Sequence, residues 1–368
     1  MARKIERTIW LFTFLIVVIG LICLYSASFG NVRVAHEVFY DQLICALLGF
    51  GLMYFLQKFD YRKFYDAAYI IYILNLFVLM LVLFAGHNAL GARRWFTIGS
   101  INFQPSEFTK LAAILILGRY FSTRRPTLAF NLFTKTQIIW RDLILPFLII
   151  TPSFILIFKQ PDLGTALLLF GIFLVIVFMS GVEYRHLLIF LGLGLCLIPF
   201  AWHFLKSYQK DRLLVFLNPN IDPLGAGYTI IQSKIAVGSG QILGKGWLAG
   251  TQSQLNFLPE RHTDFIFAVI GEEWGFVGVL VLISCYFVLI NCGLTIAQQV
   301  KDKFGMLVAV GIVSILTLQV VINIGMVIGL LPIVGLTLPL VSYGRSSFLV
   351  FIIMMGFLLN LNQRRNMV

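Results

Sequence analysis

The run FIFAVIGEEWGFVGVLVLISCYFVLINCGLTIA, residues 265–297, decides the class of fold to which this chain belongs. An α-helix needs about 20 apolar residues to cross a bilayer, and at about 1.5 Å per residue this run would extend for about 50 Å. The run is therefore too long for one straight crossing. We expect a transmembrane helix here that is tilted, broken or partly outside the bilayer.

The whole chain has the composition of a membrane protein. Hydrophobic residues make up 59% of its 368 residues and charged residues only 12%, with a mean hydropathy of +0.91, whereas soluble domains are far more polar. The apolar runs predict an all-α polytopic membrane protein with about ten transmembrane helices in a single domain, residues 1–368. The predicted spans are Ile9–Ala27, Gln42–Leu56, Ala68–Ala85, Phe108–Phe121, Leu143–Phe158, Gly164–Ser180, Leu187–Leu205, Phe265–Ala297, Gly305–Leu330 and Ser346–Leu361.

Basic residues are distributed unequally between the predicted loops. Counted from the N-terminus, one set of alternate loops holds sixteen Lys and Arg residues, and the short loops of the other set hold five. Because cytoplasmic loops are enriched in Lys and Arg, both termini are predicted to be cytoplasmic and the long loop 206–264 extracytoplasmic. Most of the net charge of +12 comes from this cytoplasmic excess of Lys and Arg, which would face anionic lipid. Nucleic acid is therefore not an expected partner.

A densely charged segment, FLPERHTDFIF at residues 257–267, leads directly into the long apolar run. It contains Glu260, Arg261, His262 and Asp264. Charged groups at a membrane boundary are costly unless they are paired or solvated, so such a cluster is a candidate functional site. The alternative is an interfacial charge network that fixes the end of a helix.

The loop 206–264 that carries this segment is rich in glycine, proline and turn signals. A loop of this length is usually functional or disordered. Apolar residues interspersed along it argue against disorder, and Tyr228–Val237 has the pattern of an amphipathic helix. We expect an ordered lid or substrate-facing loop rather than a passive connector.

A second polar constellation precedes the fourth predicted span. Glu107 and Lys110 are spaced i,i+3 on one helix face, so they are expected either to pair as a structural feature or to line a hydrated cavity. Arg93 and Arg94 are suited to binding phosphate, although snorkelling to lipid headgroups is the simpler explanation of the same residues. Asp162 is either a helix N-cap or a carboxylate that faces the same cavity.

Seven strings, in order along most of the chain, resemble the SEDS family (shape, elongation, division and sporulation), and its elongation members more than its division members. They are QPSE with Lys110 at 104–110, QPDLGT at 160–165, DPLGAGY at 222–228, QSKIAVGSG at 232–240, GKGW at 244–247, GTQSQLNFLPERHTDFIFAV at 250–269 and LPLVSYG at 338–344. One departure is Arg345, where the family usually has a glycine.

The resemblance implies a ten-helix peptidoglycan glycosyltransferase of the bacterial inner membrane. Such proteins polymerise lipid II, the undecaprenyl-pyrophosphate-linked precursor, during cell-wall elongation. They work with a class B penicillin-binding protein transpeptidase and the elongation machinery. The resemblance maps the family's essential aspartate onto Asp264 and its other motif residues onto Glu107, Lys110 and Asp162.

Glycosyl transfer from a lipid pyrophosphate needs a carboxylate base and positive charge near the leaving group. Asp264 is expected to be that base or, alternatively, a ligand for a divalent cation, Mg²⁺ or Mn²⁺. His262 is expected to have an orienting or interfacial role rather than to bind a metal. The candidate phosphate contacts are Arg93, Arg94, Lys110, Lys210, Arg212 and Arg261.

Two other functions are compatible with parts of the sequence. A lipid II flippase would also contain charges and broken helices within the membrane, but it needs polar groups that continue to the cytoplasmic side. A scaffold that only recruits an enzyme would explain the helices but not the clustered acids.

Overall fold

The computed structural model describes residues 2–29, 32–89, 92–98, 101–123, 140–205, 207–223 and 225–365. Within these ranges, ten long helices coincide with the ten predicted spans, so the predicted fold class is confirmed. They are α1 (Ala2–Ser28), α2 (Val32–Lys58), α3 (Arg62–Ala85), α4 (Pro105–Ser122), α6 (Leu145–Lys159, preceded by a π-helical turn, Trp140–Ile144), α7 (Leu163–Met179), α8 (Tyr184–Phe204), α12 (Ile266–Gln299), α13 (Lys303–Val327) and α14 (Arg345–Arg364).

Seven helices among the described residues are long and apolar enough to cross a membrane. Helix α7 and the segment Tyr184–Cys196 of α8 are also apolar but shorter. Helix α4 lies outside both groups because it carries Glu107, Lys110 and Arg119. The chain is therefore a multi-pass membrane protein, and the charged helix α4 is largely buried in the bundle.

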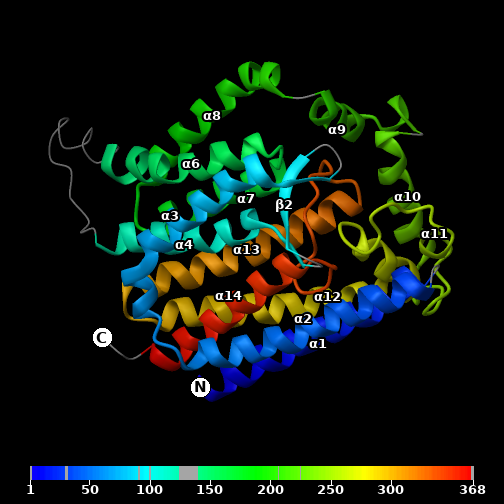
Figure 1. Ribbon diagram of the computed structural model, residues 1–368, viewed down its shortest axis with the longest axis horizontal. Helices are drawn as coiled ribbons and strands as arrows, with labels where there is room; N and C mark the ends of the chain where they lie inside the picture. Colours follow the sequence, from blue (N-terminus) through cyan, green and yellow to red (C-terminus); the bar gives the residue numbers. More distant parts are fainter. Residues whose placement is uncertain are drawn as a thin grey trace.

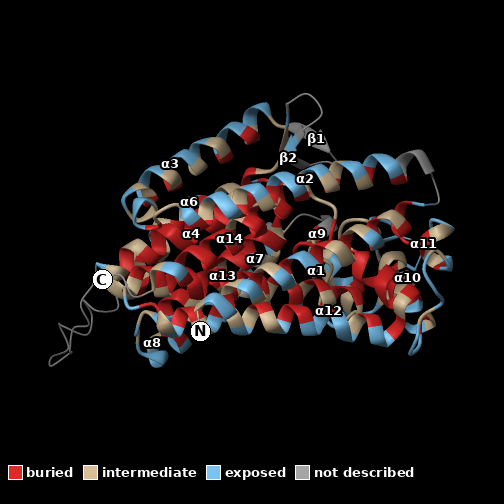
Figure 2. Ribbon diagram, turned by 90° about the horizontal axis from the view of Figure 1, so that it is seen from below, coloured by how far each residue is buried: buried red, intermediate tan, exposed pale blue. Residues whose placement is uncertain are grey.

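The centre of the bundle is formed by α4, α7, α13 and α14, where buried residues are concentrated, while α2, α3 and α8 expose apolar side chains (Figure 2). Exposed apolar faces are the expected surface of a protein in lipid. Both chain ends lie at the same end of the bundle (Figure 1), where the Asn362 side chain donates to the Ala2 carbonyl over 3.0 Å. This placement agrees with an even number of crossings.

Helix α12 is broken at Gly275, which is one of the three alternatives that its length predicted. Gly275 has φ 63° and ψ −161°, a conformation that glycine adopts at little cost. Such a break leaves backbone groups of the preceding and following turns without helical partners, and at membrane depth these must be satisfied within the protein.

The segment 241–246 satisfies the groups that the break leaves open. The amides of Lys245 and Gly246 donate to the carbonyls of Glu272 and Glu273, each over 3.0 Å. In return, the amides of Phe276 and Val277 donate to the carbonyls of Gln241 and Ile242, over 2.9 and 3.1 Å. The long loop is thereby fixed to the N-terminal third of α12.

The connection between α3 and α4 forms a small antiparallel sheet that the sequence analysis did not predict. Its strands, in the order β1-β2-β3, are β1 (His87–Ala89), β2 (Ala92–Ile98) and β3 (Ile101–Phe103). Phe96 pairs with Phe103 between β2 and β3. The sheet holds β2 close to the start of α4 (Figure 1).

The long loop is ordered over its described residues, as predicted. It contains α9 (Ser207–Leu217), a 3₁₀ turn (Pro219–Ile221), α10 (Ala226–Ser239) and α11 (Thr251–Gln254). Helix α10 includes the predicted amphipathic segment, and the Ser233 hydroxyl donates to the Val327 carbonyl over 2.9 Å. This bond joins α10 to the end of α13.

Candidate active site

Asp264 lies one residue before the N-cap of α12, at the end of the bundle away from the chain termini. Its backbone carbonyl accepts a hydrogen bond of 2.9 Å from the Asn323 side chain, which also donates to the Leu336 carbonyl over 2.7 Å. Asn323 is fully buried. Helix α13 therefore fixes the backbone of Asp264 relative to the segment that leads to α14.

The Asp264 side chain lies among charges from its own segment and from three other parts of the chain. Glu260 and Asp162 raise the pKa of its carboxyl, and Arg212 and Arg94 lower it. Burial has the largest effect, because it disfavours the ionised form, and the net result is a pKa raised from 3.8 to about 7. Asp264 is thus half-ionised near neutral pH, as suits a general base.

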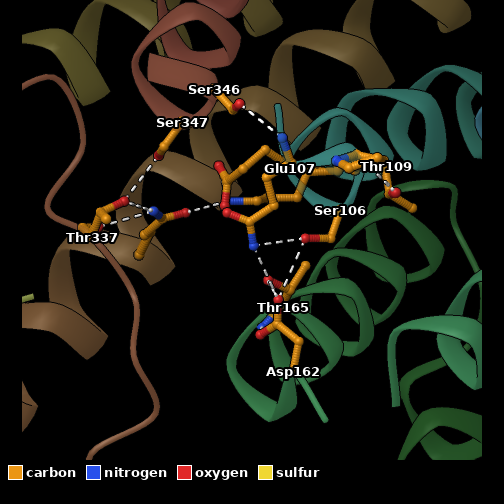
Figure 3. A network of polar contacts seen from close by, with 12 residues as sticks. Ser106, Glu107, Thr109, Asp162, Thr165, Thr337, Ser346 and Ser347 are labelled. Carbon is orange, nitrogen blue, oxygen red and sulfur yellow. Dashed lines mark hydrogen bonds and ion pairs between the residues drawn. The ribbon is translucent and has the colours of Figure 1, made fainter. Parts of the chain in front are cut away.

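Asp162 caps α7 and also faces this charged group. Its carboxylate accepts from the backbone amide of Thr165 over 3.2 Å and from the Thr165 hydroxyl over 3.0 Å. The Ser106 hydroxyl and the Gln104 amide also donate to it, over 3.4 and 3.5 Å (Figure 3). The predicted N-cap is confirmed. The carboxylate also contributes to the electrostatic field at Asp264, so its two predicted roles are compatible.

Arg94, on β2, is held against the turn that precedes α7. Its Nε donates to the Gln160 carbonyl over 2.8 Å, and its guanidinium also donates to the Pro161 carbonyl. These bonds fix the positive charge of Arg94 beside Asp162. The side chain of Arg93 lies outside the described residues.

Glu107 and Lys110 form the predicted pair inside the bundle. The two side chains are 2.8 Å apart, and Lys110 is fully buried. The Lys110 ammonium also donates to Gln319 over 2.9 Å, and Gln319 donates to the Thr337 carbonyl over 2.9 Å. Figure 3 shows this network, which joins α4 to α13 and to the segment before α14.

The other residues of the charged segment mainly fix its conformation. The Arg261 guanidinium donates to the Ala27 carbonyl at the end of α1, which occupies part of this predicted phosphate contact. The His262 carbonyl accepts from the Tyr343 amide over 2.8 Å. Burial lowers the pKa of His262, although Glu260 opposes this effect, and the imidazole is favoured in its neutral form.

Helix α9 supplies two further basic residues of the long loop, Lys210 and Arg212. Arg212 is exposed, and its guanidinium donates to the Ile333 carbonyl over 3.3 Å. Lys210 lies with its ammonium 5.9 Å from the centre of the Trp202 ring. Of these two predicted phosphate contacts, Arg212 is the one whose charge acts on Asp264.

Arg345, which replaces the family glycine, pairs with Asp41 of α2. The Tyr343 hydroxyl donates to the same carboxylate over 3.2 Å. The side chain of Arg345 is thus held at the junction of α2 and α14. Its contribution to stability should be small because both partners are partly exposed.

The sequence analysis did not identify two residues of the site. Gln319 and Asn323 contact Lys110 and the Asp264 backbone, respectively, from the otherwise apolar helix α13. They are spaced i,i+4, so they lie on one helix face. Two amide side chains at this spacing inside an apolar span were a usable signal of a polar site.

The described residues contain no group of three or more His, Cys, Asp or Glu side chains that could hold a metal ion. Mg²⁺ is commonly bound by one or two carboxylates together with substrate phosphates. Asp264, at about half ionisation, fits that limited role. A cation here would therefore take most of its ligands from substrate and water.

The fold and the site together define a polytopic membrane protein with a cluster of ionisable side chains at one end of its helix bundle. The sequence model of the FtsW/RodA/SpoVE family, described as cell cycle protein, matches residues 6–367. The chain therefore belongs to this family, the SEDS family.

Individual relatives agree with this assignment. Peptidoglycan glycosyltransferase MrdB of Escherichia coli K12 is 42% identical over 324 residues, which are 87% of this chain and 84% of MrdB. A chain from a solved peptidoglycan synthase complex, studied for its coordination of polymerization and crosslinking, has a TM-score of 0.81 and 36% identity, covering 98% of both chains. The rod shape determining protein RodA of Thermus thermophilus has a TM-score of 0.71 and 30% identity, covering 98% of this chain and 97% of RodA.

Proposed function

We propose that this protein is a peptidoglycan glycosyltransferase that polymerises lipid II during cell-wall elongation. The observation that carries the proposal is Asp264, a carboxylate with a pKa near 7 that lies at the membrane boundary within the field of Arg94 and Arg212. A lipid-linked substrate would present its reacting sugars at this level. The relatives named as peptidoglycan glycosyltransferases support the reaction class.

In the proposed reaction, Asp264 removes the proton from an acceptor sugar hydroxyl. The hydroxyl oxygen then forms a bond to the anomeric carbon of the donor, and the bond from that carbon to the lipid pyrophosphate breaks. Arg212 is the basic side chain best placed to stabilise the departing pyrophosphate, because it is exposed on α9 and its charge reaches Asp264. Such electrostatic stabilisation acts where charge develops in the transition state.

Polymerisation of labelled lipid II by the purified protein tests this proposal directly. Glycan strands should form without an added glycosyltransferase, and a class B penicillin-binding protein, the proposed crosslinking partner, should increase their yield. The solved peptidoglycan synthase complex supports such a partnership. Absence of polymer both with and without the partner would contradict the assignment.

The alternative role of Asp264 is to bind Mg²⁺ or Mn²⁺, which would neutralise the pyrophosphate. Removal of divalent cations by EDTA distinguishes the two roles. Polymerisation that continues in EDTA supports the base, whereas activity that is lost in EDTA and restored by Mg²⁺ supports the cation ligand.

A lipid II flippase is disfavoured by the interior of α4. The polar network ends at Lys110, and the following residues, Leu111–Leu117, are buried and apolar. A transporter would need polar groups beyond this point.

The polymerisation rate should increase with pH through neutrality. A base with a pKa of about 7 loses about tenfold in its ionised fraction for each pH unit below that value. Glu260→Gln should move the midpoint to lower pH, because the Glu260 charge raises the pKa of Asp264. The rate should be measured over about 1.5 pH units on either side of neutrality. A rate that does not change over this range would contradict the role of Asp264 as base.

Stability should change with pH in the opposite direction. Between pH 3.8 and about 7, the folded state retains a proton on Asp264 that the unfolded chain releases, so this contribution to stability falls as pH rises. Thermal unfolding of the wild type and Asp264→Asn over this range measures the effect. The difference between their melting temperatures should change across the window, and a constant difference would contradict the raised pKa.

We expect the long loop to be extracytoplasmic and both termini cytoplasmic. Cysteine in place of Ile221, which is 62% exposed, should react with an impermeant thiol reagent in intact spheroplasts. Cysteine in place of Lys301, which is exposed in the turn between α12 and α13, should react only after permeabilisation. The reverse pattern would invert the orientation.

A further inference from the structure

A cavity of about 350 Å³ lies at the end of the bundle opposite Asp264. It is bordered by Tyr61 and Arg62 at the start of α3, and by Asp302 and Lys303 at the start of α13. Because α12 begins just after Asp264 and ends just before Asp302, the full length of that helix separates the two sites. The cavity is therefore independent of the proposed catalytic site.

Two cations border the cavity without an ion-pair partner. Within the described part of the chain, neither Arg62 nor Lys303 lies within 4.0 Å of a carboxylate. Arg62 is exposed and Lys303 is half-buried. Arg119 adds a third positive charge nearby, because it donates to the carbonyls of Tyr65 and Asp66 over 2.8 and 2.6 Å.

The acids near the cavity leave these cations available. Asp302 accepts from the Gly305 amide over 2.6 Å and from the Tyr61 hydroxyl, so it is engaged in capping α13. Asp142, whose charge acts on Lys303, is paired with Arg141 at 3.2 Å. Asp66 is exposed and borders the cavity. Because the Arg62 side chain also bonds to Tyr61, the charged groups that face the cavity are the ammonium of Lys303, the remaining donors of Arg62 and the carboxylate of Asp66.

We infer that this cavity binds a phosphate group, supplied by the headgroup of an anionic phospholipid or by a soluble phosphate compound. Guanidinium and ammonium groups form strong charge-assisted hydrogen bonds with phosphate. Basic pockets between transmembrane helices bind phospholipid headgroups, and about 300 Å³ is enough for a small ligand. The aromatic rings of Tyr61 and Tyr65 provide apolar surface for the part of the ligand next to the phosphate.

Ligand binding by the purified full-length protein in detergent tests the inference. Native mass spectrometry would measure the affinity for short-chain phosphatidylglycerol, with phosphatidylcholine as the zwitterionic comparison. Arg62→Gln and Lys303→Gln should each weaken binding of phosphatidylglycerol by about tenfold, the effect expected for one charge-assisted hydrogen bond. Lys63→Gln and Lys301→Gln remove the same charge from exposed neighbouring positions outside the cavity lining and should change binding by less than about twofold.

Inorganic phosphate distinguishes the two sources of the ligand. Competition by millimolar phosphate would indicate a soluble phosphate compound, and binding that phosphate does not displace would indicate a phospholipid headgroup. Equal weakening by all four substitutions would show non-specific attraction and overturn the inference. Equal affinity of the wild type for phosphatidylcholine and phosphatidylglycerol would overturn it as well. Because Arg62 is exposed, its substitution should preserve the fold even if that of Lys303 does not.

Discussion

Asp264→Asn should abolish polymerisation of lipid II while leaving a folded, membrane-inserted protein. Asparagine preserves the shape of the side chain but cannot accept the proton of the acceptor hydroxyl, and loss of a general base costs about 10² to 10⁴ in rate. The fold should be retained, and near neutral pH Asp264→Asn should melt no lower than the wild type, because asparagine avoids the cost of ionising the buried carboxyl. The hydrogen bond from Asn323 to the backbone carbonyl of Asp264 remains. No side chain among the described residues donates to the Asp264 carboxylate.

A matched control for this substitution is Asp211→Asn, which removes the same charge from an exposed position on α9 next to Arg212. Both variants should express, remain folded and bind the proposed penicillin-binding partner. Only Asp264→Asn should fail to polymerise labelled lipid II. Near-normal synthesis by Asp264→Asn would assign the charged cluster to a structural role.

The transmembrane helices could be predicted from sequence because long apolar runs report directly on a lipid environment. For α12, a break was one of three alternatives that followed from the length of its run. The position of the break did not, since it depends on the segment 241–246, whose backbone bonds replace those lost at Gly275. Contacts between segments distant in sequence have no local signal.

The candidate site was predicted best where the partners are close in sequence. Glu107 and Lys110 are one helical turn apart, and Asp162 caps the helix that follows it. Arg261 was less predictable, because the direction of a long side chain is set by tertiary contacts, here the Ala27 carbonyl. The β1-β2-β3 sheet was missed because its two adjacent arginines were interpreted as an interfacial or phosphate-binding feature.

A double-mutant cycle on Glu107 and Lys110 should show strong coupling in stability. Removing one partner of a buried ion pair leaves an uncompensated charge and costs about 3 to 5 kcal/mol. In Glu107→Gln, the fully buried Lys110 ammonium would lose its carboxylate partner, and its other contacts among the described residues are the Gln319 side-chain oxygen and the Phe351 ring, whose centre is 5.6 Å away. Neither group carries a negative charge, so the single substitution should be severe.

The double variant Glu107→Gln, Lys110→Met removes both charges and should therefore destabilise the protein much less than the sum of the single changes. Thermal unfolding and lipid II polymerisation of all four proteins measure the coupling. Arg141 and Asp142 provide a comparison cycle, because their side chains are 33% and 19% exposed and exposed pairs couple by about 0 to 1 kcal/mol. Strict additivity in the Glu107 and Lys110 cycle would mean that solvent or a neighbouring group compensates each charge separately. The network that joins α4 to α13 would then not depend on the ion pair.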